Sequence, residues 1–442
     1  MKKVLLSLIL LFATIAFSQN TTKVFPYKYS EKVLNNGLKV ILIPMENTDI
    51  VAYFTVVRTG SRDEWEEGKS GFAHFFEHMM FRGTERFPGN VYDSIVTSLG
   101  ADANAYTSLD LTVYHMKFAS EDLETVMDIE SDRFRNLKYS KEEFQTESGA
   151  IYGEYRKGRT SPWSVAFESM QNMAFDKHTY KHTTIGFEKD IKEMPNLYDY
   201  SLSFYSRYYR PENCVLLVLG AIDNDKTFKL AEKYYSEWKQ GYVSPKIEDE
   251  LQQTSPRKEE VNYEGRTLPL LYIGYRGEKF DVNNNNYLAA RAFANIAFGE
   301  TSELYKKLVL KEQKVQYLMA NMMSTRDPYL FQIMSMVKDE NDINYVIEEI
   351  NKTLEYYKKN KVSEELFNKL LKREKYSFLM SLDNPANVAG ILPQYITISG
   401  GINVIDEYFS KMEKITVTDI QNAVNYYFTP EKMNQVILKG AK

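Results

Sequence analysis

Residues 208–220, YYRPENCVLLVLG, recur in altered form as residues 427–440, YFTPEKMNQVILKG. Each copy has aromatic residues, then Pro-Glu, then an apolar strand that ends in glycine, and the Pro-Glu pairs lie 219 positions apart. Residues 140–144, SKEEF, resemble residues 363–367, SEELF, at an offset of 223. A serine followed by acidic residues and a helical pattern is typical of a helix start. Two matches at nearly one offset predict a duplicated domain of about 220 residues, with chance resemblance of short segments as the alternative.

The stretch 241–260, GYVSPKIEDELQQTSPRKEE, has the composition of a linker between the two copies. It holds two prolines, many charges and few large apolar residues. The predicted domains are therefore residues 28–240 and 261–442. Strand-like runs alternate with helical patterns in both halves, and Asn36-Gly37 marks a tight turn before the first strand. This alternation predicts an α+β fold, with each domain a largely antiparallel sheet that has helices packed on one face.

The individual elements follow from apolar periodicity and from helix start and stop signals. The predicted strands are 38–43, 50–57, 112–118, 215–219, 268–275 and 330–337. The predicted helices are 70–82, 90–99, 121–136, 141–158, 196–208, 285–298, 303–313, 341–359 and 363–380.

The composition is that of a large globular protein. The 442 residues are 43% hydrophobic and carry a formal net charge of −5. We expect a packed core and no nucleic-acid partner, because nucleic-acid binding depends on clustered Lys and Arg. The single cysteine, Cys214, excludes an intramolecular disulfide and a cysteine-based zinc cluster.

Residues 1–18, MKKVLLSLILLFATIAFS, have the layout of a cleaved secretory signal peptide. Two lysines precede an apolar run, and small residues follow near its end. The alternative is a membrane anchor, but the apolar run is short for a bilayer span. We therefore expect an exported protein, periplasmic or extracellular, without a membrane anchor.

Residues 71–84, GFAHFFEHMMFRGT, contain the pattern that points most directly to chemistry. On a helix His74 and His78 are four positions apart on one face, so both imidazoles could bind one ion at about 2.0–2.1 Å. Glu77 lies beside that face and could approach a water molecule without being a ligand. The H-x-x-E-H order is the inverzincin arrangement. A pair of structural histidines with the same spacing is the alternative.

A zinc peptidase needs a third protein ligand and an open coordination position. Residues 140–159, SKEEFQTESGAIYGEYRKGR, begin with a predicted capping box formed by Ser140 and Glu143. In that helix Glu147 and Glu154 are seven positions apart, two turns, on one face. This spacing makes the two glutamates candidates for the metal site.

These segments resemble the pitrilysin, insulysin and mitochondrial processing peptidase family. HFFEHMMFRGT is close to the family signature, and Glu154 and Glu147 match the third metal ligand and the glutamate seven positions before it. The resemblance implies one Zn²⁺ per chain, with His74, His78 and Glu154 as ligands. It covers nearly the whole chain after residue 18 and is stronger in the first half.

The resemblance implies metal-assisted hydrolysis of peptides or short unfolded polypeptides. Glu77 is the expected general base. Glu147 is expected to be an auxiliary catalytic or outer carboxylate, and a plain helix-surface glutamate is the alternative. In the stretch LGADANAYTSLDLTVYHM, Asn104 and Ala105 match an edge strand where substrate would add as an extra strand.

The second half departs from the family pattern. No histidine follows His182, so the second half does not repeat the His–His–Glu site. Many family members carry there an Arg and a Tyr, seven apart, that contact substrate. In residues 308–320, LVLKEQKVQYLMA, Tyr317 fits the tyrosine, but Leu310 occupies the arginine position, unless the register is misread.

The missing arginine suggests that this chain does not act alone. We expect a dimer, with a homologous subunit as one source of the missing substrate contacts, and a substrate-binding role for Tyr317. The alternative function is a non-catalytic binding or assembly subunit with the same fold. Such subunits typically lose the His or Glu residues. This chain keeps the three motif residues, His74, Glu77 and His78, and also the distant Glu154.

Overall fold

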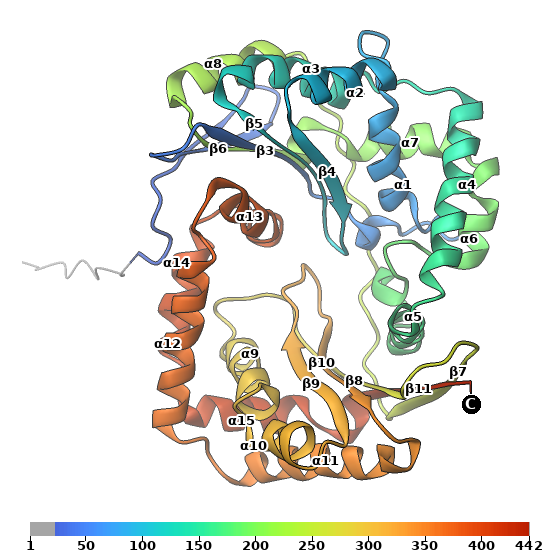
Figure 1. Ribbon diagram of the computed structural model, residues 1–442, viewed down its shortest axis with the longest axis vertical. Helices are drawn as coiled ribbons and strands as arrows, with labels where there is room; N and C mark the ends of the chain where they lie inside the picture. Colours follow the sequence, from blue (N-terminus) through green and yellow to red (C-terminus); the bar gives the residue numbers. More distant parts are fainter. Residues whose placement is uncertain (1–22, 442) are drawn as a thin grey trace, which may run out of the picture.

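Each half of the chain is built around one mixed, mostly antiparallel sheet. The computed structural model describes residues 23–441, so the predicted signal peptide, 1–18, lies outside the described residues (Figure 1). The first sheet has the order β1-β2-β6-β3-β5-β4, and the second has the order β7-β11-β8-β10-β9. Each contains one parallel pair, β2 with β6 and β7 with β11. The α+β prediction is confirmed.

The strands of the first sheet are β1 (Ser30–Val33), β2 (Lys39–Pro44), β3 (Ile50–Val57), β4 (Asp102–Thr107), β5 (Thr112–Ala119) and β6 (Cys214–Gly220). Those of the second are β7 (Arg257–Tyr263), β8 (Leu270–Arg276), β9 (Val315–Met322), β10 (Leu330–Val337) and β11 (Met433–Gly440). Without β1, the two sheets have the same strand order, with β4 and β9 as corresponding edges.

The helices of the first half are α1 (Phe72–Met79), α2 (Gly89–Ser98), α3 (Leu123–Asn136), α4 (Lys141–Gly158), α5 (Pro162–Ala174), α6 (Glu188–Glu193), α7 (Tyr198–Tyr208) and α8 (Asn224–Tyr235). Those of the second half are α9 (Asn285–Phe298), α10 (Glu303–Tyr305), α11 (Ile343–Lys359), α12 (Glu364–Met380), α13 (Pro385–Ser399), α14 (Val404–Met412) and α15 (Val417–Tyr427). The predicted helix 303–313 is instead the short α10 followed by a π-helical segment, Lys306–Lys311.

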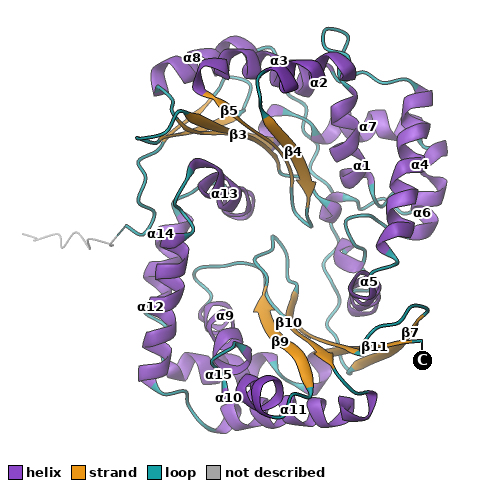
Figure 2. Cartoon of the chain, viewed as in Figure 1, coloured by secondary structure: helices purple, strands orange, loops and turns teal. Residues whose placement is uncertain are grey.

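Two helices cross between the halves. Helix α13 packs on β3 and β6 of the first sheet, and α5 packs on β7, β8 and β11 of the second (Figure 2). Both faces of each sheet are therefore covered, which explains why β3, IVAYFTVV, is apolar without alternation. The prediction of helices on one face describes the helices that belong to the same half as the sheet. It leaves out α13 and α5, the two exchanged helices, each of which covers the sheet of the other half.

The segment between the halves is held to both of them. Residues 241–256 contain no helix or strand, and β7 begins at Arg257, inside the predicted linker. The Glu250 carboxylate accepts hydrogen bonds from three successive backbone amides, 176–178, in the first half. It also pairs with Arg276 of β8 at 3.2 Å. The connection is thus fixed at Glu250, by charge-assisted hydrogen bonds to the first half and an ion pair to the second.

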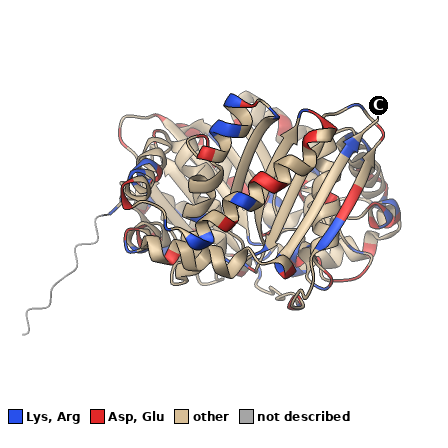
Figure 3. Cartoon of the chain, turned by 90° about the horizontal axis from the view of Figure 1, so that it is seen from below, with Lys and Arg blue, Asp and Glu red and all other residues tan. Residues whose placement is uncertain are grey.

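Charges of both signs cover the outer surface. Seen from below, Lys and Arg are interspersed with Asp and Glu along the outer helices and on the outer sheet strands (Figure 3). Among residues 23–441 no single helix is long and apolar enough to cross a membrane. Helices α13 and α14 meet those criteria only when taken together, across a bend of 85°.

Candidate metal centre

Helix α1 carries both histidines of the motif and is anchored on its apolar side. Phe72, Phe75 and Phe76 are fully buried in the core of the first half. The opposite side presents His74 and His78, whose ring centroids lie 4.9 Å apart. The i, i+4 spacing therefore places both imidazoles on one face of a helix that the core holds in place.

The start of α1 is fixed by a buried carboxylate from outside the motif. The Glu64 side chain accepts hydrogen bonds from the backbone N–H groups of Gly71, at 2.7 Å, and Ala73, at 2.6 Å. Gly71 has φ 95° and provides no side-chain cap. A Cβ at this position would lie 2.6 Å from the Ile185 carbonyl oxygen. Gly71 has no side chain that could accept these hydrogen bonds at the start of the helix. Glu64 therefore provides the acceptors in its place.

Helix α4 brings the distant glutamate to the histidines. The Ser140 side chain and Glu143 form the predicted capping box, which fixes where α4 begins. Glu154 Oε2 lies 3.6 Å from His74 Nε2 and 3.5 Å from His78 Nε2. The structure thus brings together the three ligands named from the sequence.

The two contacts of Glu154 Oε2 have the length that a zinc site requires between neighbouring ligand atoms. Ligands bound at 2.0–2.1 Å in a tetrahedral site lie about 3.3–3.4 Å from one another. The two observed nitrogen–oxygen distances, 3.5 and 3.6 Å, are close to that value. The Nδ1 atom of His74 is buried and makes no hydrogen bond within the described residues. The donor set of two imidazoles and one carboxylate therefore fits Zn²⁺.

Glu77 is the second carboxylate beside the histidines. Its carboxylate oxygen and a nitrogen of each imidazole all lie within 4.8 Å of one another. By distance alone Glu77 could also be a ligand. Glu154 is favoured as the ligand because a single oxygen of it is nearly equidistant from both Nε2 atoms. This leaves Glu77 free to face a water molecule.

The electrostatic environment favours a neutral His74. Burial, and then the neighbouring His78, lower the pKa of His74 to about 4, so that its imidazole is available as a ligand at neutral pH. The hydrogen bond to Glu147 raises the pKa of His78 and lowers that of Glu147. Burial raises the pKa of Glu77, and the neighbouring Thr107 and His78 partly oppose this effect.

Glu147 lies behind His78 and not at the ligand position. The Nδ1–H group of His78 donates to Glu147 Oε1 at 2.9 Å. This contact orients the ring so that Nε2 faces Glu154. Arg82 donates to the other oxygen of the same carboxylate. Of the two roles left open from the sequence, these contacts favour an outer carboxylate that positions a ligand.

The edge strand β4 borders the same site. A cavity of about 400 Å³ adjoins His78, with Asn104 and Ala105 in its wall beside Glu77. Strand β4 pairs with β5 on one side only. Its outer edge is thus available for a further strand next to the candidate metal-binding group.

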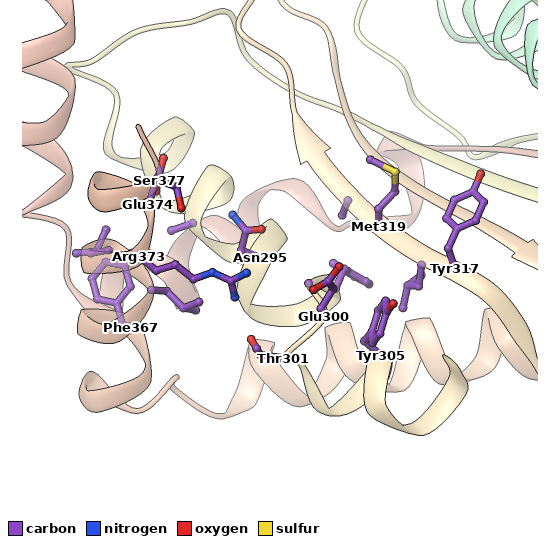
Figure 4. A pocket seen from close by; sticks show the side chains of 17 residues that line it. Asn295, Glu300, Thr301, Tyr305, Tyr317, Met319, Phe367, Arg373, Glu374 and Ser377 are labelled. Atoms are coloured by element: carbon purple, nitrogen blue, oxygen red, sulfur yellow. The ribbon is translucent and has the colours of Figure 1, made fainter. Parts of the chain in front are cut away.

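Tyr317 lies elsewhere in the described structure. It is on β9 of the second half, where its ring packs on Trp163 of α5 with centroids 5.9 Å apart. It lines a separate cavity of about 690 Å³ between β9, α9 and α12 (Figure 4). Leu310 is 61% exposed on the π-helical segment. The structure therefore does not join Tyr317 to the histidines of its own chain.

Two residues of this centre were not identified from the sequence. Glu64 precedes the helix by several residues, and an acidic residue near a helix start is a signal that could have indicated it. Arg82 is part of the quoted motif, yet its partner Glu147 is 65 positions away. No local pattern in a single sequence predicts a contact of that range.

Two family models match consecutive parts of the chain. The insulinase model, peptidase family M16, matches residues 39–187, and the peptidase M16 inactive domain matches residues 197–374. The chain belongs to the M16 peptidase family. Within it, the first match contains the whole candidate metal centre, and the second contains Tyr317. The family is one of zinc proteases, and the His-x-x-Glu-His group is present in this M16 chain.

Full-length relatives agree with this assignment. The M16 chain is 28% identical to the zinc protease PqqE of Helicobacter pylori, over 97% of this chain and 96% of that protein. It is 27% identical to the beta subunit of the mitochondrial processing peptidase of Saccharomyces cerevisiae, over 92% and 90%. A solved structure of a protease from Helicobacter pylori matches with a TM-score of 0.87 at 27% identity, over 93% of this chain and 99% of that one.

Proposed function

We propose that this M16 chain is a zinc-dependent endopeptidase that hydrolyses peptides or short unfolded polypeptides. The observation that carries the proposal is the position of Glu154 Oε2, at 3.6 and 3.5 Å from the Nε2 atoms of His74 and His78. These two imidazoles and one carboxylate form a three-ligand site of the kind that leaves a fourth position open for chemistry.

The side chains of this centre divide the work of hydrolysis. A bound Zn²⁺ would supply Lewis-acid activation of water and of the peptide carbonyl. Glu77 accepts a proton from the attacking water on its carboxylate and then donates that proton to the leaving amine. Glu147 keeps the His78 ring in the orientation that directs Nε2 at the metal position.

Substrate backbone would pair with β4 along Asn104 and Ala105. That strand has a free edge, and the cavity beside it includes Glu77 and His78. Backbone pairing holds an extended chain and reads few side chains. Unfolded peptides are therefore the favoured substrates, because a folded protein does not offer a free extended segment.

We further propose that the active form is a dimer. The position expected to hold a substrate-binding arginine is Leu310, and Tyr317 contacts Trp163 of its own chain. A second subunit, identical or homologous, would supply the missing contacts. Export to the periplasm or the cell exterior is also part of this proposal, and it rests on residues 1–18 alone.

The test compares two variants of the purified chain. Glu77→Gln keeps the side-chain size and removes the base, so we expect about one zinc per chain and a loss of peptide cleavage of at least about 100-fold. Glu121→Gln, an exposed glutamate outside the site, is the matched control and should behave as the wild type. Zinc is measured by elemental analysis and cleavage with an unstructured fluorogenic peptide, before and after chelation.

Each outcome of this comparison has a distinct meaning. Cleavage that survives in Glu77→Gln would contradict the assigned base. Zinc binding without cleavage by the wild type, alone and as a dimer, would favour the non-catalytic binding or assembly subunit. The dimer is tested by measuring molar mass and activity across a dilution series, and full activity of the monomer would exclude it.

A further inference from the structure

Arg82 is the only described side chain that contacts the second oxygen of Glu147. The Glu147 side chain is 7% exposed, and each of its oxygens has one partner: His78 on Oε1 and Arg82 on Oε2. The three side chains thus form one continuous chain of charge-assisted hydrogen bonds. It runs from the surface, where Arg82 is 41% exposed, to the imidazole of a proposed metal ligand.

The backbone holds Arg82 in place for this contact. Arg82 ends the 3₁₀ turn, Met80–Arg82, that continues α1, and Gly83 follows with φ 90°. A Cβ on Gly83 would lie 2.3 Å from the Phe87 carbonyl oxygen, so only glycine fits this close approach. The turn after the motif therefore directs Arg82 back towards α4.

We propose that Arg82 is a positioning residue for the metal centre, acting on His78 through Glu147. This proposal rests on the proposed function only in taking His78 as a metal ligand. A buried carboxylate that loses one partner has one oxygen without a hydrogen bond, which favours its reorientation towards solvent. The imidazole then loses the acceptor that fixes the direction of its Nε2 atom, and metal binding weakens.

A second role for Arg82 would be direct contact with substrate. Arg82 and Asp93 both line the cavity of about 400 Å³ beside β4. A substrate contact would change binding of peptide and leave binding of metal unchanged. The contact with Glu147 favours the positioning role, because that carboxylate is the only ion-pair partner of Arg82 within the described residues. The two roles are distinguished by zinc affinity measured without substrate. In an Arg82 variant this affinity falls if Arg82 positions Glu147, and it is unchanged if Arg82 only contacts substrate.

The experiment measures the zinc dissociation constant by competition with a chromogenic chelator. Arg82→Met keeps the length of the apolar stem and removes the guanidinium, and we expect zinc affinity to fall by about 10-fold. Arg82→Lys should recover part of this loss, because an ammonium can still pair with one carboxylate oxygen. Arg86→Met is the matched control: Arg86 pairs with Asp128 on the surface, so zinc affinity should not change.

A double-mutant cycle with Glu147→Gln decides whether Arg82 acts through that carboxylate. If it does, the Arg82→Met, Glu147→Gln double variant binds zinc no more weakly than Glu147→Gln alone. Additive losses would overturn the proposal, as would unchanged zinc affinity in Arg82→Met accompanied by a raised KM for peptide. Because zinc binding is measured without turnover, these results are independent of whether Glu77→Gln abolishes cleavage.

Discussion

Helices α4 and α12 occupy corresponding places in the two halves and carry different side chains at matching positions. Both begin at a serine whose hydroxyl accepts a backbone N–H three residues on, and these serines, Ser140 and Ser363, are 223 positions apart. At that offset Glu147 corresponds to Leu370 and Glu154 to Ser377. The carboxylate behind His78 is thus replaced by an apolar residue, and the carboxylate of the proposed third ligand by a hydroxyl.

The surroundings of the two helices repeat the same contrast. In the first half, α1 and α4 lie beside the edge strand β4 and form the candidate metal centre. In the second half, α9 and α12 lie beside the edge strand β9 and enclose the cavity of about 690 Å³ (Figure 4). Both halves therefore have a groove next to a free sheet edge, and the two grooves differ in the side chains that line them.

The largest effect should come from removing the proposed third ligand. Glu154→Gln eliminates the charged oxygen that lies beside both imidazoles, so we expect zinc affinity to fall by more than about 100-fold. The same helix position in the second half gives the control, because Ser377→Ala should leave one zinc per chain. Elemental analysis after dialysis measures both. Equal zinc loss in the two variants would contradict the prediction that only the first half binds zinc through this helix position.

The exchanged helices should contribute similarly to stability. Met170 on α5 and Leu392 on α13 are both fully buried, each in contact with the sheet of the other half. Truncation to alanine at either position should cost about 2–5 kcal/mol of unfolding free energy. Urea denaturation measures this, with the 78% exposed Met380→Ala as control. A loss of unfolding free energy below about 1 kcal/mol at one position would show that only one of the two exchanged helices contributes strongly to stability.

The contact between the halves at Asp110 should make stability depend on pH. The carboxylate accepts hydrogen bonds from the Tyr180 hydroxyl, at 2.7 Å, and the backbone N–H of Arg326, at 3.0 Å. Burial raises the pKa of Asp110 to about 6. Its ionised form is thus disfavoured in the folded state, so its contribution to stability is fully present below about pH 4 and is lost as pH rises through about 6.

The measurement compares wild type with Asp110→Asn by urea denaturation at pH 5 and pH 8. Relative to the variant, the wild type should be more stable at pH 5 than at pH 8, by about 1–2 kcal/mol. Asparagine does not titrate, so the variant lacks the pH-dependent contribution of Asp110 to stability. The contributions of all other titratable groups remain. A difference that is constant with pH would show that Asp110 titrates near its ordinary value.

The smallest effect is expected at Tyr317. Tyr317→Phe removes one hydroxyl and keeps the ring that packs on Trp163. Zinc content and unfolding free energy should not change, whereas KM for peptide should rise by about 2–10-fold, the value of one hydrogen bond. Steady-state kinetics on the proposed dimer measures this. An unchanged KM would contradict a contact between substrate and the Tyr317 hydroxyl.

Sequence patterns predicted the elements that are locally specified. Strands 50–57 and 330–337 and helices 141–158 and 285–298 have the predicted bounds. The helix over 141–158 is set by a capping box, and the strands by short apolar runs. His74, His78 and Glu154 were predicted as metal ligands because H-x-x-E-H together with a distant glutamate matches the pattern of the family that the sequence resembles.

The elements that depend on the other half were not predicted. Helix α13 contains Pro393, and its apolar residues contact the first sheet, so it lacks the polar face that marks a surface helix. Helix α5 likewise packs on the second sheet. The predicted helix 303–313 changes to a π-helical segment before Gln313, which has φ 54°. Such features follow from long-range packing that a single sequence does not display.

The exchange of α5 and α13 also affects how the chain can be made. The last strand of the first sheet ends at Gly220, but the helix that covers its second face begins at Pro385. At about 5–20 residues per second, a ribosome needs roughly 10–30 s to synthesise the segment between them. During that interval one side of a finished apolar sheet lacks its native cover. A nascent chain of this design offers a long window for chaperone binding.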